Sequence, residues 1–183
     1  CRLVVGLLHE TTMNQPPESL AWDDLWPHLC RPPGSGIPAF SAGVGAALAL
    51  QRRLYQAQSG DAEVAAAEED AIAARWRASL RPTSLAAARV AVLGVPSDTG
   101  AGIRRGAAYG PRGVRAALLD LPEYRAWLRD GSVIDLGDVF VNPHLLHDGM
   151  LAAAQRRLCQ DAMYPQASAE LRAELPVAPL SQV

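Results

Sequence analysis

The pattern of apolar and polar positions predicts two strands in the second half of the chain. Residues 88–95 (ARVAVLGV) form an unbroken apolar run that is rich in β-branched side chains, and residues 132–139 (SVIDLGDV) also predict a strand. An unbroken apolar run of this length is typical of a strand that is covered on both faces, as in parallel sheets. Residues 88–139 therefore predict one β–loop–α–β unit, whose crossover should be right-handed.

The helix inside this unit is predicted from turn residues and from spacing. Gly110-Pro111 predicts its start, because proline is favoured at the first helical position. Val114, Leu118 and Leu121 follow at helical spacing, which predicts that they share one face of the helix. Gly131 predicts the end of the unit before the second strand begins.

Two helices are predicted upstream of this unit. Residues 43–58 place apolar side chains near one helical face, and residues 61–80 predict a second helix that Asp61 can cap. The apolar stripe of the second helix consists of Ile72, Trp76 and Leu80. Pro82 is expected to stop this helix.

The chain divides into three segments by composition. Residues 1–42 are rich in proline and glycine and predict an irregular head, in which RLVVGLL is a candidate strand. Residues 43–85 predict a helical insertion, and residues 86–183 contain the β–α–β part of the main domain. After the second strand we expect helices at about 148–160 and 168–175, then a further strand in the terminal PVAPLSQV.

Composition and charge exclude some classes of function. The net charge of −2 gives no attraction to nucleic acid or to an anionic membrane surface. No apolar run is long enough to span a bilayer, and the first residues lack the cleavage site of a signal peptide.

The cysteines bear on the redox compartment: Cys1, Cys30 and Cys159 are widely spaced, odd in number and without a CxxC motif. This favours free thiols in a reducing compartment, and thus a cytoplasmic protein.

A glycine-rich segment follows the first predicted strand. Residues 96–110 lie where ligands bind in an open α/β sheet, beyond the carboxyl ends of the strands. Asp98 can accept hydrogen bonds from loop amides and fix the turn. Arg104 and Arg105 offer planar, always charged donors that suit a carboxylate or a structural carbonyl. The spacing matches no nucleotide-binding motif, so two interpretations stay open, a functional loop and a rigid structural turn.

Three motifs, in order along the chain, resemble the ureohydrolases, the family of arginase, agmatinase, guanidinobutyrase and formiminoglutamase. GVPSDTGAGIRRGAAYGPRGVR (94–115) resembles the N-terminal signature of that family. The matching positions are Gly94, Pro96, Asp98, Gly100, Arg104, Gly106, Ala107, Gly110, Pro111 and Arg115. GSGIPAF (34–40) and IDLGDVFVNP (134–143) resemble the agmatinase-like branch more than arginase itself.

The resemblance implies a fold, an activity and a set of site residues. The implied fold is the N-terminal part of an arginase-like three-layer α/β/α parallel sheet, preceded by an irregular head and an inserted helical pair. The implied activity is hydrolysis of a small guanidino substrate to urea and an amine, with two Mn²⁺ ions as cofactors. By the same resemblance Asp98, Gly100, Arg104, Arg105 and Gly106 are expected to border the substrate, and none is expected to be catalytic.

The metal-binding segments of the family are absent from the sequence. Gly-Gly-Asp-His, Asp-Ala-His-x-Asp and Asp-x-Asp do not occur. In the family the first of them follows a strand that resembles PVAPLSQV, so the metal ligands are expected on polypeptide beyond Val183. Asp135 and Asp138 have the chemistry of metal ligands, but in the resembling motif they are structural and hold the loop to the next helix.

One other cluster has the residue types of a metal site. His144, His147 and Asp148 lie within five residues, but no second cluster partners them. The favoured interpretation is a polar helix start that Asp148 or His147 caps. Ser97 and Cys159 lack a base at a recognisable spacing, so neither is predicted to be a nucleophile.

The sequence leaves alternative functions open. One is the N-terminal portion of a guanidino hydrolase, inactive by itself. Another is a non-catalytic ureohydrolase-like scaffold or regulatory subunit, and a third is an unrelated α/β module with a chance loop match. A half-sheet has an open edge, so we expect an oligomer or a companion chain.

Overall fold

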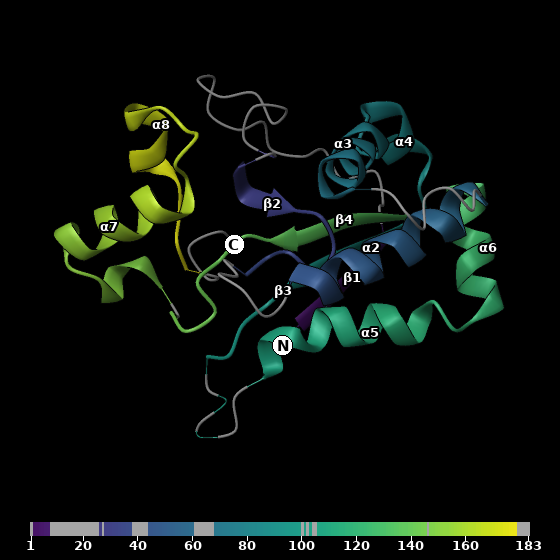
Figure 1. Ribbon diagram of the computed structural model, residues 1–183, viewed down its shortest axis with the longest axis horizontal. Helices are drawn as coiled ribbons and strands as arrows, with labels where there is room; N and C mark the ends of the chain where they lie inside the picture. The colour runs from purple at the N-terminus through teal and green to yellow at the C-terminus, as the bar shows by residue number, and fades with distance from the viewer. Residues whose placement is uncertain are drawn as a thin grey trace.

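A computed structural model describes residues 2–7, 26, 28–37, 44–60, 68–99, 101, 103, 106–145 and 147–178 of the chain. In these residues a sheet lies between helices (Figure 1), so the predicted α/β class is confirmed. Most of the predicted irregular head, residues 8–25, lies outside the described residues. Every helix in the described ranges is too short or too polar to traverse a lipid bilayer.

The sheet has four strands in the order β1-β3-β4-β2. β3 (Val90–Val95) and β4 (Val133–Val139) run parallel at its centre, as predicted. β1 (Arg2–Leu7) confirms the strand predicted for RLVVGLL and pairs antiparallel with β3, while β2 (Cys30–Arg31) pairs antiparallel with β4. The expected parallel sheet therefore holds for the central pair and is corrected at both edges. Strand direction depends on pairing between distant segments, which the apolar pattern of one strand does not encode.

One face of the sheet is covered by three helices that share a core with it. They are α2 (Val44–Ser59), α5 (Gly110–Leu118) and α6 (Pro122–Asp130). Their cluster with β3 and β4 consists of Leu50, Leu54, Ala57, Val92, Leu119, Tyr124, Leu128 and Val133. The bounds of α2 confirm the helix predicted at 43–58. The segment predicted as a helical insertion thus contributes directly to the core of the sheet.

The opposite face is covered by α3 (Glu69–Ser79) and α4 (Pro82–Ala87). Figure 1 shows both above the sheet and α5 below it, which gives the expected three layers. The predicted stripe of α3 is confirmed, because Ile72 and Trp76 are buried and Leu80 packs against them. Pro82 ends α3 as predicted and also begins α4, since its fixed φ suits the first helical position. The predicted start of this helix at residue 61 was wrong, because Glu68 is extended and α3 begins at Glu69, so Asp61, which lies outside the described residues, does not cap α3.

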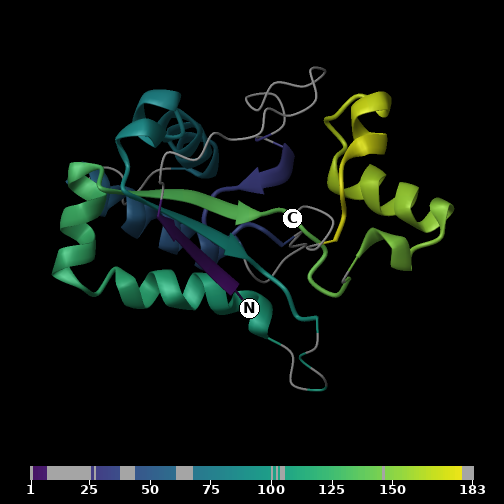
Figure 2. The ribbon, with the colours of Figure 1, turned by 180° about the vertical axis from the view of Figure 1, so that it is seen from behind.

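The crossover between the central strands contains two helices in succession. Figure 2 shows α5 below the sheet and α6 turning up beside it. Leu121 is extended and Pro122 begins α6, because a residue before proline is disfavoured in the α region. Pro111 and Arg115 are the buried residues of α5, whereas Val114 and Leu121 are 41% and 50% exposed. The helix predicted from the spacing of these apolar residues is confirmed over Gly110–Leu118, but Leu121 follows it and its fully buried side chains are those of Pro111 and Arg115.

Residues 147–178 form what we call the C-terminal lobe, which lies beyond the carboxyl end of β4 (Figure 2). It contains a 3₁₀ turn, η3 (Asp148–Met150), and two helices, α7 (Ala153–Met163) and α8 (Ala169–Glu174). The single helix predicted at 148–160 is thus η3 followed by α7. No strand is present at residues 176–178, and the rest of the predicted terminal strand lies outside the described residues.

Candidate functional site

The loops that follow β3 and β4 meet at one edge of the sheet. We call residues 96–109 the glycine-rich loop and residues 140–147 the β4 loop. Because β3 and β4 are parallel, their carboxyl ends lie side by side, where α/β sheets bind their ligands. The Asp98 amide donates a hydrogen bond to the Pro143 carbonyl at 2.8 Å. This contact ties the two loops together at the position where a ligand site is expected.

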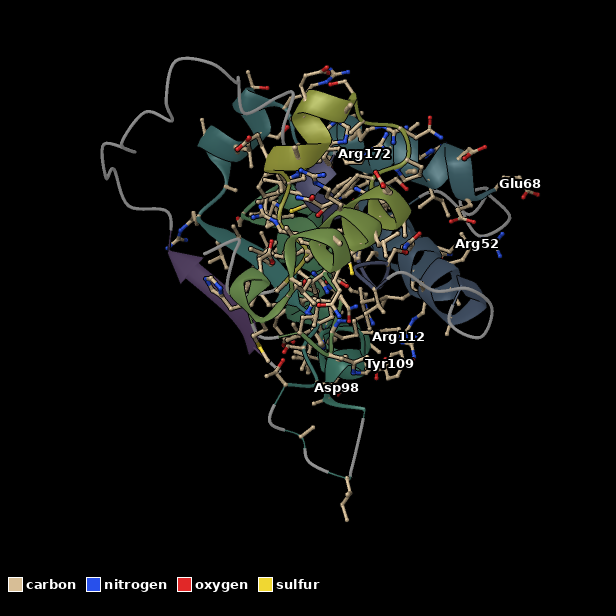
Figure 3. The ribbon with its side chains drawn as sticks, turned by 90° about the vertical axis from the view of Figure 1, so that its left-hand side faces the viewer. Arg52, Glu68, Asp98, Tyr109, Arg112 and Arg172 are labelled. Carbon is tan, nitrogen blue, oxygen red and sulfur yellow. The ribbon has the colours of Figure 1, made fainter. Side chains whose placement is uncertain are left out.

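Asp98 fixes the base of the glycine-rich loop. Its side chain is buried, and its Oδ1 accepts hydrogen bonds from the amides of Gly106 at 3.0 Å and Ala108 at 2.9 Å. Gly106 has φ = 123°, a conformation that glycine adopts readily and other residues avoid. Figure 3 shows Asp98 near Tyr109 and Arg112, where the loop leaves the body of the protein. The prediction that Asp98 accepts loop amides and fixes the turn is confirmed.

The sequence of the glycine-rich loop contains the other expected substrate-binding residues. Gly100, Arg104 and Arg105 lie outside the described residues, so their contact with substrate stays a prediction. Ile103 is fully exposed. At the other end of the loop, the Arg112 guanidinium lies over the Tyr109 ring, with Cζ 4.9 Å from the ring centre. The described part of the loop therefore combines a fixed base with an apolar side chain in solvent.

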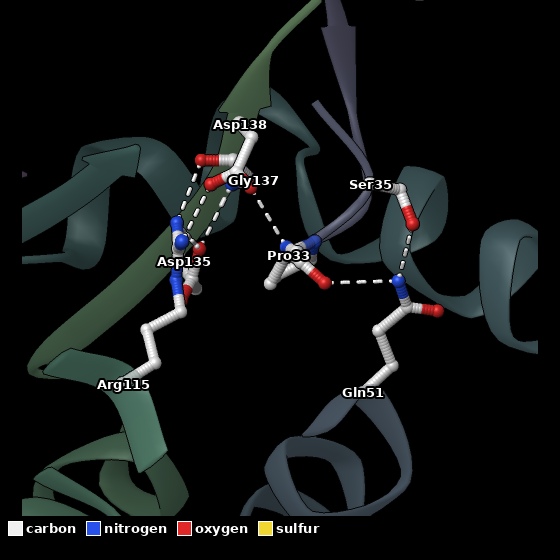
Figure 4. A network of polar contacts seen from close by, with 8 residues as sticks. Pro33, Ser35, Gln51, Arg115, Asp135, Gly137 and Asp138 are labelled. Atoms are coloured by element: carbon white, nitrogen blue, oxygen red, sulfur yellow. Dashed lines mark hydrogen bonds and ion pairs between the residues drawn. The ribbon is translucent and has the colours of Figure 1, made fainter. Parts of the chain in front are cut away.

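A buried ion network lies beneath this edge and is centred on Arg115 (Figure 4). Arg115 is 0% exposed. Its Nε and Nη2 donate to the two carboxylate oxygens of Asp135 at 2.7 and 3.0 Å, and its Nη1 donates to Asp138 at 2.5 Å. Nη2 also donates to the Gly137 carbonyl at 2.7 Å. One planar guanidinium thus satisfies two carboxylates and a carbonyl, which a lysine ammonium does not match in geometry.

We call Arg115, Asp135 and Asp138 the Arg115 network. Burial and charge shift the pKa values of Arg115 and Asp135 in opposite directions. Burial lowers the pKa of Arg115, but the charges of both aspartates and their hydrogen bonds raise it above its ordinary value. Complete burial raises the pKa of Asp135, while the Arg115 charge and hydrogen bonds from Arg115 and the Gly137 amide oppose that shift. Carboxylates held in this way are structural, as the resemblance implied, because their oxygens already have partners.

Two glycines let the backbone approach the Arg115 network closely. A Cβ at Gly94 would overlap Oδ1 of Asp138. Gly137 has φ = 84°, and a Cβ there would overlap the Arg31 carbonyl of β2. The glycines of the GVP and LGDV segments are therefore required by space and by backbone conformation.

The network extends to the segment that follows β2. The Gly34 amide donates to Oδ2 of Asp138 at 2.8 Å, and Gln51 of α2 donates to the Pro33 carbonyl at 2.9 Å (Figure 4). Residues 38–40 of the first motif lie outside the described residues. The described parts of the three motifs therefore converge on one place in the fold, although they are far apart in the sequence.

The histidines of the β4 loop lie beside backbone turns. Nδ1 of His147 accepts a hydrogen bond from the Gly149 amide at 3.0 Å and caps η3, as predicted. The His144 amide donates to Oδ1 of Asn142 at 3.1 Å, a local turn contact. Both histidines are exposed. In the part of the chain that the structure describes, no three His, Cys, Asp or Glu side chains are arranged to hold a metal ion.

Asp148 fastens the end of the C-terminal lobe to the start of the same lobe. It is buried, and its carboxylate accepts hydrogen bonds from the amides of Val177 at 3.2 Å and Ala178 at 2.8 Å. Arg156 of α7 approaches the same carboxylate, with Nε 3.5 Å from Oδ2. The Asn142 amide adds a hydrogen bond to the Val177 carbonyl at 3.0 Å. Asp148 therefore binds a segment distant in sequence and does not cap a helix, which corrects one of the two caps considered.

The side chains in the described ranges do not fit the two Mn²⁺ ions that the resemblance implies. A two-metal site needs several Asp and His ligands on neighbouring strand ends. Asp135 and Asp138 are engaged by Arg115, and Asp148 is engaged by backbone amides. We therefore assign no chemical step to a metal held by these residues.

Arg115 is the residue whose role the sequence reasoning missed. It belongs to the matching motif, but the apolar periodicity around Val114 does not indicate a buried cation. A signal was present in SVIDLGDV, because Asp135 and Asp138 are two carboxylates within a strand that is otherwise apolar. Buried carboxylates need a cation or several donors. That cation comes from α5, the helix that connects the two strands.

Comparison with known proteins adds one finding. Residues 88–173, somewhat less than half of the chain, match the model of the Arginase family. The matched residues run from just before β3 into α8 and include Asp98 and the whole Arg115 network. No curated protein and no solved structure matches the chain. The match supports the ureohydrolase superfamily for this segment.

Proposed function

We propose, from the Arginase family match of residues 88–173, that the chain is the N-terminal portion of a metal-dependent guanidino hydrolase. The observation that carries the proposal lies inside the matched segment. There Asp98 ties two loops together at the carboxyl edge of the parallel strands, and the Arg115 network holds α5 to β4 beneath them. The activity proposed is agmatinase-like, with release of urea and an amine. The Mn²⁺ ligands are proposed to lie on polypeptide beyond Val183.

In this proposal the described residues hold the substrate-binding loop and take no part in proton transfer. Asp98 positions the loop by accepting the Gly106 and Ala108 amides, and the Arg115 network joins α5, into which the loop leads, to β4. Asp98, Gly100, Arg104, Arg105 and Gly106 are proposed to border the substrate. A cytoplasmic location and assembly with further copies or a companion chain belong to the same proposal.

The test is urea release by the protein made from its complete coding sequence. After loading with Mn²⁺, the protein is assayed with agmatine, guanidinobutyrate, arginine and guanidine. We expect urea from agmatine or guanidinobutyrate at a rate well above that from arginine. Urea from none of the four would overturn the proposal and favour a non-catalytic scaffold or regulatory subunit. In that case co-purification with a second chain should be observed.

A variant of Asp98 tests its positioning role in the same assay. Asp98→Ala should lower kcat/KM by about 10- to 100-fold, because a displaced loop no longer orients the substrate. The Mn²⁺ content should not change, since Asp98 is not proposed as a ligand. The control is Asp120→Ala, which removes a carboxylate that is exposed and paired with Arg53. Equal kcat/KM for the two variants would contradict the role of Asp98.

A further inference from the structure

The outward face of α5 is apolar. The exposed positions of this helix are Gly113, Val114 and Ala117. Tyr109 just before it and Leu121 just after it are 53% and 50% exposed. Figure 1 and Figure 2 show α5 along the lower side of the protein, with the sheet above it and no described helix or strand below it. A surface helix normally turns its polar face to solvent, so this apolar face indicates a surface that a partner covers.

Four of these residues form a row that we call the α5 stripe: Tyr109, Gly113, Ala117 and Leu121. They recur every four positions, so they lie one above another along the helix. The stripe has a bulky side chain at each end and small residues in the middle. A Cβ at Gly113 would meet no atom within 4 Å, so the space over the middle of the stripe is open. The order of sizes is the same from either end, which suits pairing with an antiparallel copy of itself.

The charged groups that flank the α5 stripe lie at its two ends. Arg112 lies in the first turn of the helix, and Asp120 and Glu123 follow its last turn. Asp120 pairs with Arg53 at 2.8 Å, and Arg125 donates to a backbone carbonyl at the end of α5. Glu123 forms no ion pair with the described residues. An antiparallel second copy brings Arg112 of each chain toward the acidic end of the other, whereas a parallel copy places like charges together.

We propose that the α5 stripe binds a second copy of this chain, with the two α5 helices antiparallel about a two-fold axis. Gly113 of each copy faces Ala117 of the other beside the axis, and each Tyr109 meets the Leu121 of the other copy. An interface of one helix from each copy is small, so we expect a dissociation constant of about 1–100 µM. The pairing names a surface for the assembly included in the proposed function, and its test measures association without any reference to urea release.

Analytical ultracentrifugation of the full protein tests the interface. We expect association into dimers, or into multiples of two if further surfaces also associate. Ala117→Glu should raise the dissociation constant of the dimer at least about tenfold, because it places two like charges close to the apolar axis. The matched control is Ala154→Glu in α7, since both alanines are exposed on helices and both variants should keep the wild-type Tm. Wild-type protein of monomer mass up to about 200 µM, or equal dissociation constants for the two variants, would overturn the proposal.

Cysteine pairing tests the antiparallel register. Gly113→Cys and Ala117→Cys are prepared with different tags in a Cys1→Ser, Cys159→Ser background and are mixed before mild oxidation. We expect the disulfide between the two variants to form at least about tenfold faster than that between two chains of the same variant, because only the mixed pair is directly opposed. Equal rates would overturn the register. Absence of any cross-link would overturn the second copy as occupant, and thiols that also resist a small maleimide would show that another segment covers the stripe.

A charge swap tests the pairing of the two ends. Arg112→Glu and Glu123→Arg should each raise the dissociation constant of the dimer by roughly fivefold, since each brings like charges together at both ends of the interface. The double variant restores opposite charges and should recover most of that loss. A double variant as weak as the sum of its single changes would overturn the pairing of Arg112 with the acidic end.

Discussion

Two sets of buried carboxylates in this protein are satisfied in different ways. Asp135 and Asp138 face the guanidinium of Arg115, and all three side chains are at most 4% exposed. Asp148 is also buried, but its close partners are the backbone amides of residues 177 and 178. Arg156, which is 41% exposed, reaches it only at 3.5 Å.

This difference in partners determines which parts of the fold each set of carboxylates holds together. The Arg115 network joins side chains of a strand and a helix, so removal of Arg115 leaves two charges uncompensated in the interior. Asp148 joins a side chain to the main chain of a peripheral segment, and its removal leaves neutral amides without an acceptor and takes a carboxylate from Arg156, which is 41% exposed. We therefore expect the whole sheet to depend on Arg115, and only the end of the C-terminal lobe to depend on Asp148.

The largest effect is expected from Arg115→Leu. It should lower the free energy of unfolding by about 3–5 kcal/mol, because Asp135 and Asp138 lose their cation. The measurement is urea unfolding followed by tryptophan fluorescence. Arg53→Leu is the control, since its ion pair with Asp120 is exposed on both sides and should contribute less than about 1 kcal/mol.

Arg115→Lys keeps the charge and so provides a measurable variant if the leucine variant does not fold. Its stability should lie between those of the wild type and Arg115→Leu, because an ammonium group does not reproduce the bidentate contact. Stability equal to that of the wild type would show that charge alone, without the planar geometry, holds the network.

The close packing of the same network predicts the next effect. Gly94→Ala should lower the free energy of unfolding by about 2–3 kcal/mol, because the added Cβ would overlap Asp138. Gly113→Ala is the matched control in α5, where a Cβ meets no atom within 4 Å. That variant should raise stability by about 0.5–1 kcal/mol through helix propensity. A neutral Gly94→Ala variant would contradict the tight approach of β3 to Asp138.

Asp148→Ala should have a smaller and more local effect. We expect a loss of about 1–2 kcal/mol, because two buried amides lose their acceptor. Hydrogen exchange should show reduced protection of the Val177 and Ala178 amides and unchanged protection in β3 and β4. Reduced protection in the central strands as well would mean that the C-terminal lobe and the sheet unfold as one unit.

The smallest effect is expected in the reactivity of two native thiols, those of Cys30 and Cys159. Cys30 is 3% exposed, and burial raises its pKa to about 12, so very little reactive thiolate is present at pH 8. Cys159 of α7 is partly exposed in the C-terminal lobe. In a Cys1→Ser background, a thiol reagent should modify Cys159 at least about tenfold faster than Cys30, which reacts only after the sheet opens. Equal rates would show that the two regions open together.

The sequence allowed prediction of the elements that adjacent residues determine. The apolar run predicted β3, and Pro111 predicted the start of α5. Gly131, at φ = 78°, ends α6 as predicted. The acceptor role of Asp98 was also predictable, because aspartate side chains in turns often accept hydrogen bonds from nearby backbone amides. In each case the cause lies within about ten residues of its effect.

Features that depend on distant partners were not predictable in the same way. The outer strands are antiparallel because of the segments they pair with, and the partners of Asp148 are backbone amides, which any residue type can supply. Pro122 did give a local signal for the break between α5 and α6. Of the candidate site, the loop base was predictable, whereas the partner of Asp135 and Asp138 required knowledge of which helix face is buried.

The hydrogen bond from Gly34 to Asp138 joins residues that are 104 positions apart. During synthesis, the early segment around β2 must wait until β4 has left the ribosome before this contact can form. Such long loops close slowly, and native contacts of high sequence separation slow folding. Until that moment α2 has no complete sheet to pack against, so its apolar face stays exposed while the rest of the chain is made.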